Sequence, residues 1–295
     1  MSEVIDVALG FDANYAPHAG GVIASIARHA PDARFRFICL HDGVGETLRA
    51  KVEACAPGAA FFWAQVKDED LPAFSTRGHF NRAILFRIGL EKLAPADCAR
   101  VIYVDSDVTV LGDIRELWSA NLLGNAIGAV RDCYQDGVEF SQRWSLPAPP
   151  RYFNSGVLVI DLARVRADRA FAAAADFVAR HGEDILFGDQ DALNWVFWRR
   201  WIELDPAWNV QRYMSAPEIA AAGWSRATPA LIHYIGMQKP WMANVWHPWA
   251  WAYWDNIRQT PFADEIAAAN KMSLYQLMRL RLRWWLRRPS GARVP

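Results

Sequence analysis

Residues 101–114 read VIYVDSDVTVLGDI, and this stretch decides how the rest of the chain is interpreted. Its first four residues are apolar and mostly β-branched, which predicts a strand buried on both faces. The strand ends in Asp105-Ser106-Asp107 before the apolar pattern resumes. Because side chains alternate along an extended chain, Asp105 and Asp107 are expected on the same side of it. Two ionised carboxylates so close together repel each other unless a cation lies between them, so the sequence predicts a divalent cation site or, alternatively, a solvated turn.

This stretch lies within an alternation of strands and helices. Strands are predicted at 4–9, 35–40 and 59–64, and helices at about 18–28, 46–55 and 79–93. This order is typical of an α/β fold in which a mostly parallel sheet carries helices on both faces. Such sheets bind ligands outside the carboxyl ends of their strands, where Asp12 and Asn14 follow the first strand as Asp105 and Asp107 follow the fourth. We therefore expect these four side chains in one crevice.

Further polar residues flank the predicted elements of the second half. A helix is predicted over 162–180, and Asp189-Gln190-Asp191 begins another, where the helix dipole favours acids. Helix capping alone would also explain Asp189, and a hydrogen-bonded core position would explain His233 at the end of a short strand. Arg87 and Lys239, taken singly, are typical of solvated surface charges.

Composition limits the class of protein. The chain has 295 residues, 53% hydrophobic and 22% charged, as expected for a well-packed soluble protein. No apolar run reaches the roughly 18 to 20 residues needed to span a membrane, and the first residues lack a basic signal-peptide region. The four cysteines are widely spaced, which favours reduced thiols in the cytoplasm.

The C-terminal tail differs from the rest in charge. From Lys271 onward there are seven basic residues and no acids. We expect Asn270 to cap a helix over 271–288, with Arg279, Arg283 and Arg287 on one face. Apolar residues gather on the other face: Leu274, Leu277, Met278, Leu282 and Trp285. A basic amphipathic helix of this kind suits an anionic membrane surface, and a helix docked on the core is the alternative.

Tryptophan is concentrated in the second half, with twelve of the fifteen between Trp195 and Trp285. The residues between Trp241 and Trp254 could stack against an acceptor sugar. They could equally pack the C-terminal segment onto the sheet, because large aromatic side chains are common in cores. The sequence does not decide between these two interpretations.

Six separated motifs carry a resemblance when they are taken together. In chain order they are Asp12-Ala13-Asn14-Tyr15, Leu85-Phe86-Arg87-Ile88, Asp105-Ser106-Asp107, Phe153-Asn154-Ser155-Gly156, Gly188-Asp189-Gln190-Asp191 and His233-Tyr234-Ile235-Gly236-Met237-Gln238-Lys239-Pro240-Trp241. Their order and spacing resemble the retaining glycosyltransferases of family 8, in particular the bacterial lipopolysaccharide galactosyl- and glucosyltransferases. The resemblance implies a GT-A-like nucleotide-sugar transferase domain over 1–241, followed by a Trp-rich and basic extension over 242–295.

The resemblance also implies a role for each matching residue. It makes Asp105, Asp107 and His233 the metal ligands, with Mn²⁺ better suited than Mg²⁺ to a mixed imidazole and carboxylate set. Contacts to the nucleotide donor are implied for Asp12, Asn14, Tyr15, Arg87, Ser106, Gly236 and Lys239. The sugar-facing, catalytic residues are then Asn154, Asp189 and Gln190, whose amide and carboxylate groups can orient hydroxyls. A covalent route would need Asp189 or Gln190 as nucleophile, and we favour same-face attack because an amide is a poor nucleophile.

The expected activity is metal-dependent, retaining transfer of a hexose from a UDP-sugar, galactose or glucose, to a lipopolysaccharide-type or lipid-linked acceptor. We expect it at the inner face of a membrane, held through the C-terminal basic helix, with no nucleic-acid partner. Two alternatives are transfer to a soluble glycan or protein and a nucleotide-sugar binding module without turnover. A sugar nucleotidyltransferase is disfavoured, because Gly10-Phe11-Asp12 is not a Gly-rich phosphate loop.

Overall fold

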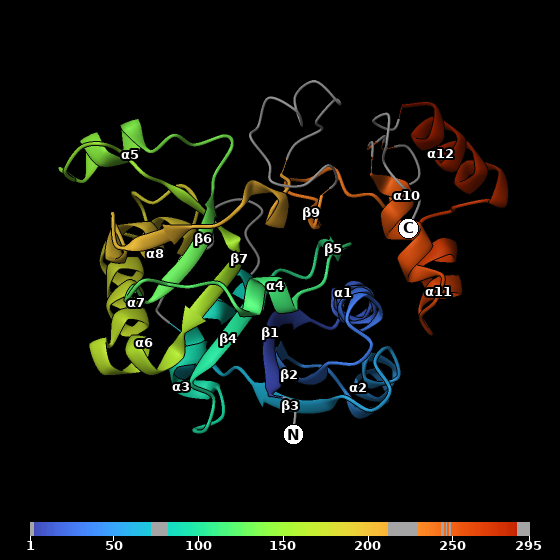
Figure 1. Ribbon diagram of the computed structural model, residues 1–295, viewed down its shortest axis with the longest axis horizontal. Coiled ribbons are helices and arrows are strands. Elements are labelled where there is room, and N and C mark those ends of the chain that lie inside the picture. Colours follow the sequence, from blue (N-terminus) through green and yellow to red (C-terminus); the bar gives the residue numbers. More distant parts are fainter. Residues whose placement is uncertain are drawn as a thin grey trace.

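A seven-stranded sheet forms the centre of the protein, and helices cover both of its faces (Figure 1). The computed structural model describes residues 3–71, 82–211, 229–242, 245, 247 and 249–287. The strands lie in the order β3-β2-β1-β4-β7-β6-β8. β1 is parallel to β2 and β4, β2 to β3, and β6 to β8, whereas β7 is antiparallel to its neighbours β4 and β6. The predicted mostly parallel sheet flanked by helices is therefore confirmed.

The elements have the following bounds. The strands of the large sheet are β1 (Val4–Asp12), β2 (Arg34–Asp42), β3 (Ala60–Gln65), β4 (Arg100–Val104), β6 (Ile127–Arg131), β7 (Phe153–Asp161) and β8 (Trp201–Glu203). The α-helices are α1 (Ala16–His29), α2 (Glu46–Glu53), α3 (Leu90–Leu93), α4 (Arg115–Trp118), α5 (Val138–Arg143), α6 (Leu162–Asp168), α7 (Ala170–His181), α8 (Asp189–Val196), α10 (Ala250–Ile257), α11 (Ala263–Ala269) and α12 (Leu274–Arg287). Within the described residues the 3₁₀ helices are η1 (Asp68–Asp70), η2 (Arg82–Gly89) and η3 (Pro206–Trp208).

Strand β4, which ends just before Asp105, is buried on both faces as predicted. Ile102 and Val104 belong to the apolar cluster that contains α1, whereas Val101 and Tyr103 belong to the cluster that contains α6 and α7. Alternate side chains of one strand thus serve two cores. This double burial explains the continuous apolar run before the acidic pair.

A second, two-stranded sheet completes the topology and was not predicted. It pairs β5 (Val108–Val110) with β9 (Leu231–His233) in antiparallel register, Val108 opposite His233. The chain from Asn209 extends this sheet, because Val210 forms a parallel bridge with Ile232. Segments more than a hundred residues apart in the sequence are thereby held side by side.

Three sequence expectations about helices are corrected. The helix expected over 79–93 is, in its described part, a 3₁₀ helix followed by a single α-turn, and 79–81 lie outside the described residues. The helix expected over 162–180 is two helices, because Arg169 adopts a left-handed conformation with φ 51° between them. Asn270 does not cap α12; it ends α11, donating its amide to Ile266 O. Ser273 precedes α12 instead and exchanges hydrogen bonds with Gln276, an arrangement known as a capping box.

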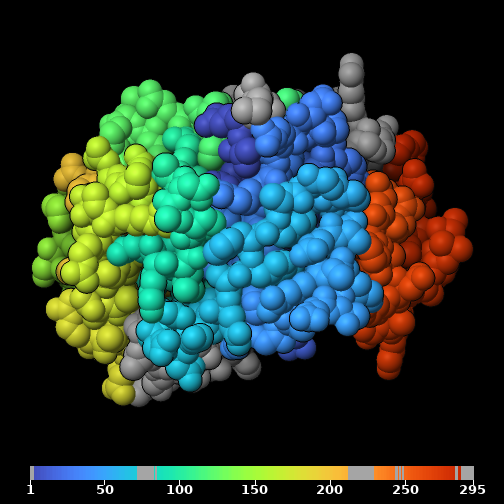
Figure 2. Space-filling model, turned by 90° about the horizontal axis from the view of Figure 1, so that it is seen from below, coloured from blue at the N-terminus to red at the C-terminus, as the bar shows by residue number. Residues whose placement is uncertain are grey.

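The C-terminal helices pack against the N-terminal half of the protein. Asn256 Nδ2 donates to Gly21 O in α1, and Phe262 and Ile257 belong to the same core as α1. Figure 2 shows the orange and red C-terminal segment against the blue N-terminal half, at the end of the molecule opposite the yellow α6 and α7. Helix α12 docks through Leu277 and Leu280, which are partly buried against this core.

The tryptophans of the second half are mainly core residues. Trp241, Trp249, Trp251 and Trp254 are all less than a tenth exposed and belong to one apolar cluster. The packing interpretation therefore holds for these four, and Trp246 lies outside the described residues. Among the described helices, none has both the length and the apolar character that crossing a bilayer requires.

Candidate active site

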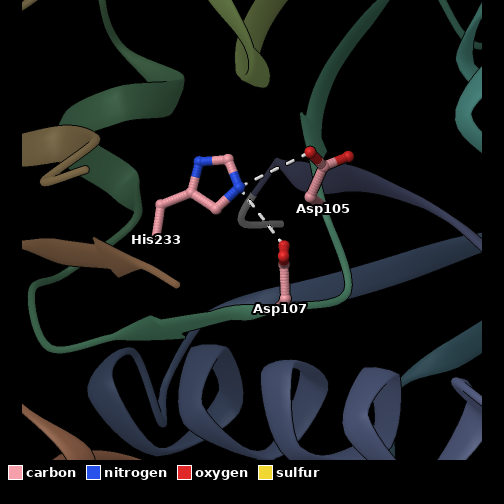
Figure 3. Close-up of side chains that lie close together, drawn as sticks. All are labelled: Asp105, Asp107 and His233. Carbon is pink, nitrogen blue, oxygen red and sulfur yellow. Dashed lines mark ion pairs between the residues drawn. The ribbon is translucent and has the colours of Figure 1, made fainter. Parts of the chain in front are cut away.

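Three candidate metal ligands meet where β4 gives way to the small sheet (Figure 3). Asp105 directly follows β4, and its backbone N–H donates to Gly156 O in β7 over 2.8 Å. Asp107 directly precedes β5, and its carbonyl accepts from Tyr234 N over 2.9 Å. This pairing brings His233 Nε2 to 3.2 Å from Asp107 Oδ1 and 3.6 Å from Asp105 Oδ2.

One donor atom from each of these residues lies within 4.8 Å of the others. Two carboxylates and one imidazole nitrogen form a donor set that suits a divalent transition metal. The arrangement of Asp105, Asp107 and His233 therefore fits the metal site that the sequence predicts.

Gly156 makes room for this cluster. A Cβ atom added at Gly156 would lie 2.2 Å from His233 Cε1 and 2.7 Å from Asp105 Oδ2. Neither atom belongs to a long flexible side chain that could easily move away. The last residue of Phe153-Asn154-Ser155-Gly156 must therefore lack a side chain for two of the candidate ligands to converge.

A network of buried amides lies beside the cluster. Asn154 Nδ2 and Gln190 Nε2 each donate to Asp132 Oδ2 over 3.1 Å. Gln190 Oε1 accepts from Ser155 N over 3.0 Å, and Asn154 Oδ1 accepts from Gly156 N over 3.0 Å. The two backbone N–H groups fix which end of each amide carries oxygen, so the orientation of this polar wall is determined.

Arg87 lies between two of the acids. Its Nη2 donates to Asp105 Oδ1 over 3.0 Å, and its Nη1 donates to Ser155 O. Its Nε is 2.5 Å from Asp189 Oδ2, a charge contact without hydrogen-bond alignment. The guanidinium also lies over the Tyr103 ring, 4.7 Å from its centroid. Arg87 therefore links the end of β4 to the start of α8.

Asp189 is the candidate site acid whose pKa is raised above its ordinary value. Burial raises its pKa, the Arg87 guanidinium opposes that rise, and the Asp105 carboxylate adds to it, so the pKa of Asp189 is about 7. Asp191 has a structural task instead, since its Oδ2 accepts from Leu186 N and Phe187 N and its Oδ1 accepts from Tyr152 Oη. The two acids at the start of α8 thus differ in role.

Lys239 contacts the acidic pair directly. Its Nζ is 2.5 Å from Asp107 Oδ2 and donates to Tyr234 O over 2.7 Å. Burial raises the pKa of Asp107, but its contacts with Lys239 and His233 outweigh burial and hold that pKa below its ordinary value. Asp107 is therefore ionised over the whole physiological pH range.

The three candidate metal ligands and most of the polar residues around them line one cavity of about 660 Å³. Of the predicted site residues, those that line it are Tyr15, Arg87, Asp105, Ser106, Asp107, Asn154, Asp189, Gln190, His233, Gly236 and Lys239. Asp12 and Asn14 are not among the lining residues. Asp12 Oδ1 accepts from Tyr15 N and so shapes the turn that presents Tyr15. Asp105 and Asp107 therefore line the expected crevice, whereas Asp12 and Asn14 do not.

Sequence reasoning missed three polar residues of the site. Asp132 directly follows β6 and lines the cavity, the same position after a strand that singled out Asp12 and Asp105. Tyr103 lies inside β4 and donates its hydroxyl to Asp105 Oδ1 over 3.1 Å. Asn209 follows η3, and its Oδ1 lies 3.0 Å from His233 Nδ1. Only Asp132 carried a usable sequence signal.

Similarity to known proteins extends over most of the chain. Residues 6–245 match the sequence profile of glycosyl transferase family 8. General stress protein A of Bacillus subtilis is 27% identical over 272 residues, which cover 88% of this chain and 94% of that protein. Lipopolysaccharide 1,2-glucosyltransferase of Escherichia coli is 25% identical over 273 residues, which cover 90% of this chain and 80% of that protein.

Solved structures show the same fold. The galactosyltransferase LgtC, in complex with donor and acceptor sugar analogues, is 25% identical with a TM-score of 0.73, and the match covers 94% of this chain and all of LgtC. The bifunctional glycosyltransferase WbbM is 24% identical with a TM-score of 0.74, covering 92% of this chain and 52% of WbbM. The expected GT-A-like fold is thus confirmed. Because the family profile extends over most of the chain, the protein belongs to glycosyl transferase family 8 and is a glycosyl-transferring enzyme.

Proposed function

We propose that this enzyme transfers a hexose, galactose or glucose, from a UDP-sugar to a lipopolysaccharide-type or other glycan acceptor, with retention at the anomeric carbon and dependence on a divalent cation. The observation that carries the proposal is the convergence of Asp105, Asp107 and His233 with Lys239 on one cavity. Transfer from a nucleoside diphosphate has to stabilise a departing diphosphate, so anion-binding groups must be grouped at one side of the site.

Asp105, Asp107 and His233 are the residues that would hold Mn²⁺, with Mg²⁺ as a substitute. When bound, the cation supplies positive charge that neutralises the diphosphate as it departs. Lys239 uses two of its three N–H groups on Asp107 and Tyr234 O, which leaves one for a phosphate oxygen. Gly236, with φ 76° and open space at its Cβ position, allows close approach of its backbone to the same phosphates.

Tyr15 and Ser106 are assigned to the nucleotide side of the cavity. Ser106 Oγ donates to Gly10 O, which ties the acidic turn to the end of β1. Asp12 and Asn14 are assigned to the uridine as well; Asp12 lies at the Tyr15 turn, and Asn14 is exposed beside it. These residues would position the base and ribose of the donor.

Asn154, Asp189 and Gln190 are assigned to the sugar side, and Arg87, assigned to the donor, contacts Asp189. The Gln190 amide is held at both ends, by Ser155 N and by Asp132, so it is poorly placed to act as a nucleophile. Asp189 is buried against Arg87, and burial raises its pKa to about 7, so near neutral pH part of this carboxyl is protonated and a poorer nucleophile. Both observations favour same-face attack over a covalent route.

A membrane-surface location is part of the proposal. Six large apolar side chains of α12 are more than half exposed: Leu274, Tyr275, Met278, Leu282, Trp285 and Leu286. Arg279 is exposed on the same helix, whereas the side chains of Arg283 and Arg287 lie outside the described set. An apolar stripe beside basic residues favours an anionic lipid surface, and hence a lipid-linked acceptor at the inner face of a membrane. Transfer to a soluble glycan or protein remains the alternative for the acceptor.

The test is release of UDP from a panel of UDP-sugars, with Mn²⁺ or with EDTA. We expect release from UDP-galactose or UDP-glucose with Mn²⁺ only, and loss of it by a factor on the order of 10² or more in Asp105→Asn and Asp107→Asn. Asp97→Asn, which alters an exposed acid paired with Arg36, is the matched control and should retain activity. Anomeric configuration of the product, read by NMR, tests retention. Tight binding of UDP-sugar without release of UDP would indicate a binding module instead. Release of UDP that persists in EDTA would show that the reaction does not depend on a divalent cation.

A further inference from the structure

The candidate ligand His233 uses both of its ring nitrogens. Its Nε2 faces the Asp105 and Asp107 carboxylates, and its Nδ1 is 3.0 Å from Asn209 Oδ1. His233 is 4% exposed and Asn209 is 2% exposed, so water does not compete for this contact. A neutral imidazole carries one proton, and only the nitrogen without it can bind a metal.

The orientation of Asn209 follows from a backbone group. Gly156 N–H can only donate, and it donates to Asn154 Oδ1 over 3.0 Å. Asn209 Nδ2 donates to the same oxygen over 2.9 Å, so the oxygen of Asn209 must face His233. Turning the Asn209 amide would bring two amide oxygens together, and turning Asn154 as well would set its NH₂ against the Gly156 N–H. Only one orientation of the Asn154 and Asn209 amides therefore gives every group in this chain of hydrogen bonds a suitable partner.

The proton on His233 is therefore directed to Nδ1. An amide oxygen only accepts hydrogen bonds, so the nitrogen facing it must be the donor. The two carboxylates favour the other tautomer, because either of them would accept a hydrogen bond from an Nε2–H. That second tautomer would place a proton where the cation must bind.

We propose that Asn209 is a positioning residue that holds His233 in the tautomer with a free Nε2, and that it is itself held through Asn154 by the backbone of Gly156. The inference rests on the metal site of the proposed function and adds a residue to which that proposal gives no role. Backbone pairing supports the placement, since Val210 N–H donates to Leu231 O and His233 N–H donates to Val210 O. The segment carrying Asn209 is thus paired with the strand that carries His233.

The first experiment observes the ring directly. Long-range ¹H–¹⁵N NMR of histidine-labelled protein, recorded where the ring carries a single proton, reports which nitrogen holds that proton. The His233 signal is identified by its absence in His233→Gln. We expect Nδ1–H in the wild-type protein, and Nε2–H or a mixture in Asn209→Leu. A wild-type spectrum with the proton on Nε2 overturns the proposal, whether or not Asn209→Leu folds.

The second experiment measures Mn²⁺ affinity of the full chain by calorimetry or by EPR of the free ion. Removing an outer partner of a metal-bound histidine typically costs 10- to 100-fold in affinity, and we expect this loss in Asn209→Leu. Asn209→Asp retains an acceptor for Nδ1–H but loses the N–H that Asn154 Oδ1 accepts, so it should lose less Mn²⁺ affinity than Asn209→Leu does. Asn256→Leu removes another buried amide, which bonds Gly21 O and Arg28, and controls for a general loss of stability.

The outcomes separate this inference from the proposed function. If the wild type does not bind Mn²⁺, the proposed function fails, and the tautomer spectrum still decides the inference. If the wild type binds and folded Asn209→Leu binds equally well, the inference alone is overturned. Equal losses in Asn209→Leu and Asn256→Leu would also overturn it, because the effect would then be one of stability.

Discussion

Lys239 Nζ lies 2.5 Å from Asp107 Oδ2, so the lysine assigned to the donor diphosphate is also the ion-pair partner of a candidate metal ligand. Two functions therefore depend on one positive charge. The ammonium repels a cation approaching Asp107, and it attracts a phosphate approaching the same place. Replacing it should change the two binding steps in opposite directions.

We expect Lys239→Met to bind Mn²⁺ alone more tightly and to bind UDP with Mn²⁺ more weakly, each by about tenfold. A tenfold change in affinity corresponds to about 1.4 kcal/mol of binding free energy. This is less than the Coulomb energy of roughly 4 kcal/mol between two unit charges 4 Å apart near a protein surface. Calorimetry with Mn²⁺, with UDP and with both measures the two steps. Lys51→Met, which removes an exposed ion pair with Glu265, is the control and should leave both unchanged. If both affinities of Lys239→Met fell together, its role would be structural support.

Gly156→Ala tests the space in which the ligands converge. The new Cβ would meet the His233 ring at 2.2 Å and the Asp105 carboxylate at 2.7 Å. Overpacking of this kind typically costs about 1–3 kcal/mol of folding free energy, and here it would also separate two ligands. We expect a lower melting temperature and at least about a tenfold loss of Mn²⁺ affinity, which is the effect of only 1.4 kcal/mol.

The matched control for this change is Gly45→Ala. Gly45 has φ −74° and nothing within 4 Å of an added Cβ, so the substitution should leave metal binding unchanged and affect stability only through the N-terminus of α2, which Gly45 caps. Wild-type Mn²⁺ affinity in a folded Gly156→Ala protein would contradict the proposed geometry of the site.

The site residues that local sequence patterns predicted lie where predicted strands end. Apolar runs gave the strands, and the acids after them marked the edge of the sheet where the cavity lies. Asp105 and Asp107 could be paired by alternation along the chain alone. Their third partner could not, because His233 reaches them through the register of β5 with β9. That register pairs Val108 with His233, 125 positions apart, and the short strands carry no local signal for it.

Other features depended on packing and were missed for the same reason. A left-handed Arg169 divides a helix whose residues have ordinary helical propensity throughout. In α12 the periodic pattern placed Leu277 on one apolar face with Leu274, Met278, Leu282 and Trp285, whereas in the structure Leu277 and Leu280 pack against the core and those four are exposed. Asn209 has a role only because a backbone N–H two segments away fixes the orientation of its neighbour.

His18 makes stability depend on pH. Its ring stacks on Trp241, with centroids 3.8 Å apart, and burial lowers its pKa to about 4. The unfolded chain, with an ordinary value of about 6.5, binds a proton over that interval and the folded protein does not. Stability from this group is therefore present above pH 6.5 and is lost as the pH falls toward 4.

The measurement is the free energy of unfolding by denaturant between pH 7 and 4.5. One proton taken up on unfolding gives a slope of at most about 1.4 kcal/mol per pH unit, reduced here because the ring is partly exposed. His18→Phe retains a ring against Trp241 and cannot titrate, so its slope should be shallower than that of the wild type. Identical slopes would mean that other groups cause the acid sensitivity.

The apolar stripe of α12 leads to a prediction about lipid binding. Helix α12 already docks on α10 through Leu277 and Leu280, so Met278, Leu282 and Trp285 are not needed to hold it there. Their exposed surface is available to a bilayer, where each large side chain contributes about 1.5–3 kcal/mol when fully buried. The triple change to serine should therefore weaken binding to vesicles containing anionic lipid by at least about tenfold, equivalent to 1.4 kcal/mol.

Vesicle sedimentation measures this binding, and release of UDP with a soluble acceptor should be unaffected by the triple change. Serine at Phe62, Leu123 and Val138, three exposed apolar residues on other elements, is the matched control and should bind vesicles as the wild type does. Because exposed charges are screened by salt, a membrane contact should also weaken as ionic strength rises. If the triple variant instead binds vesicles normally and turns a dimer into a monomer in light scattering, the stripe contacts a second copy of the chain, and the lipid surface is ruled out as its partner.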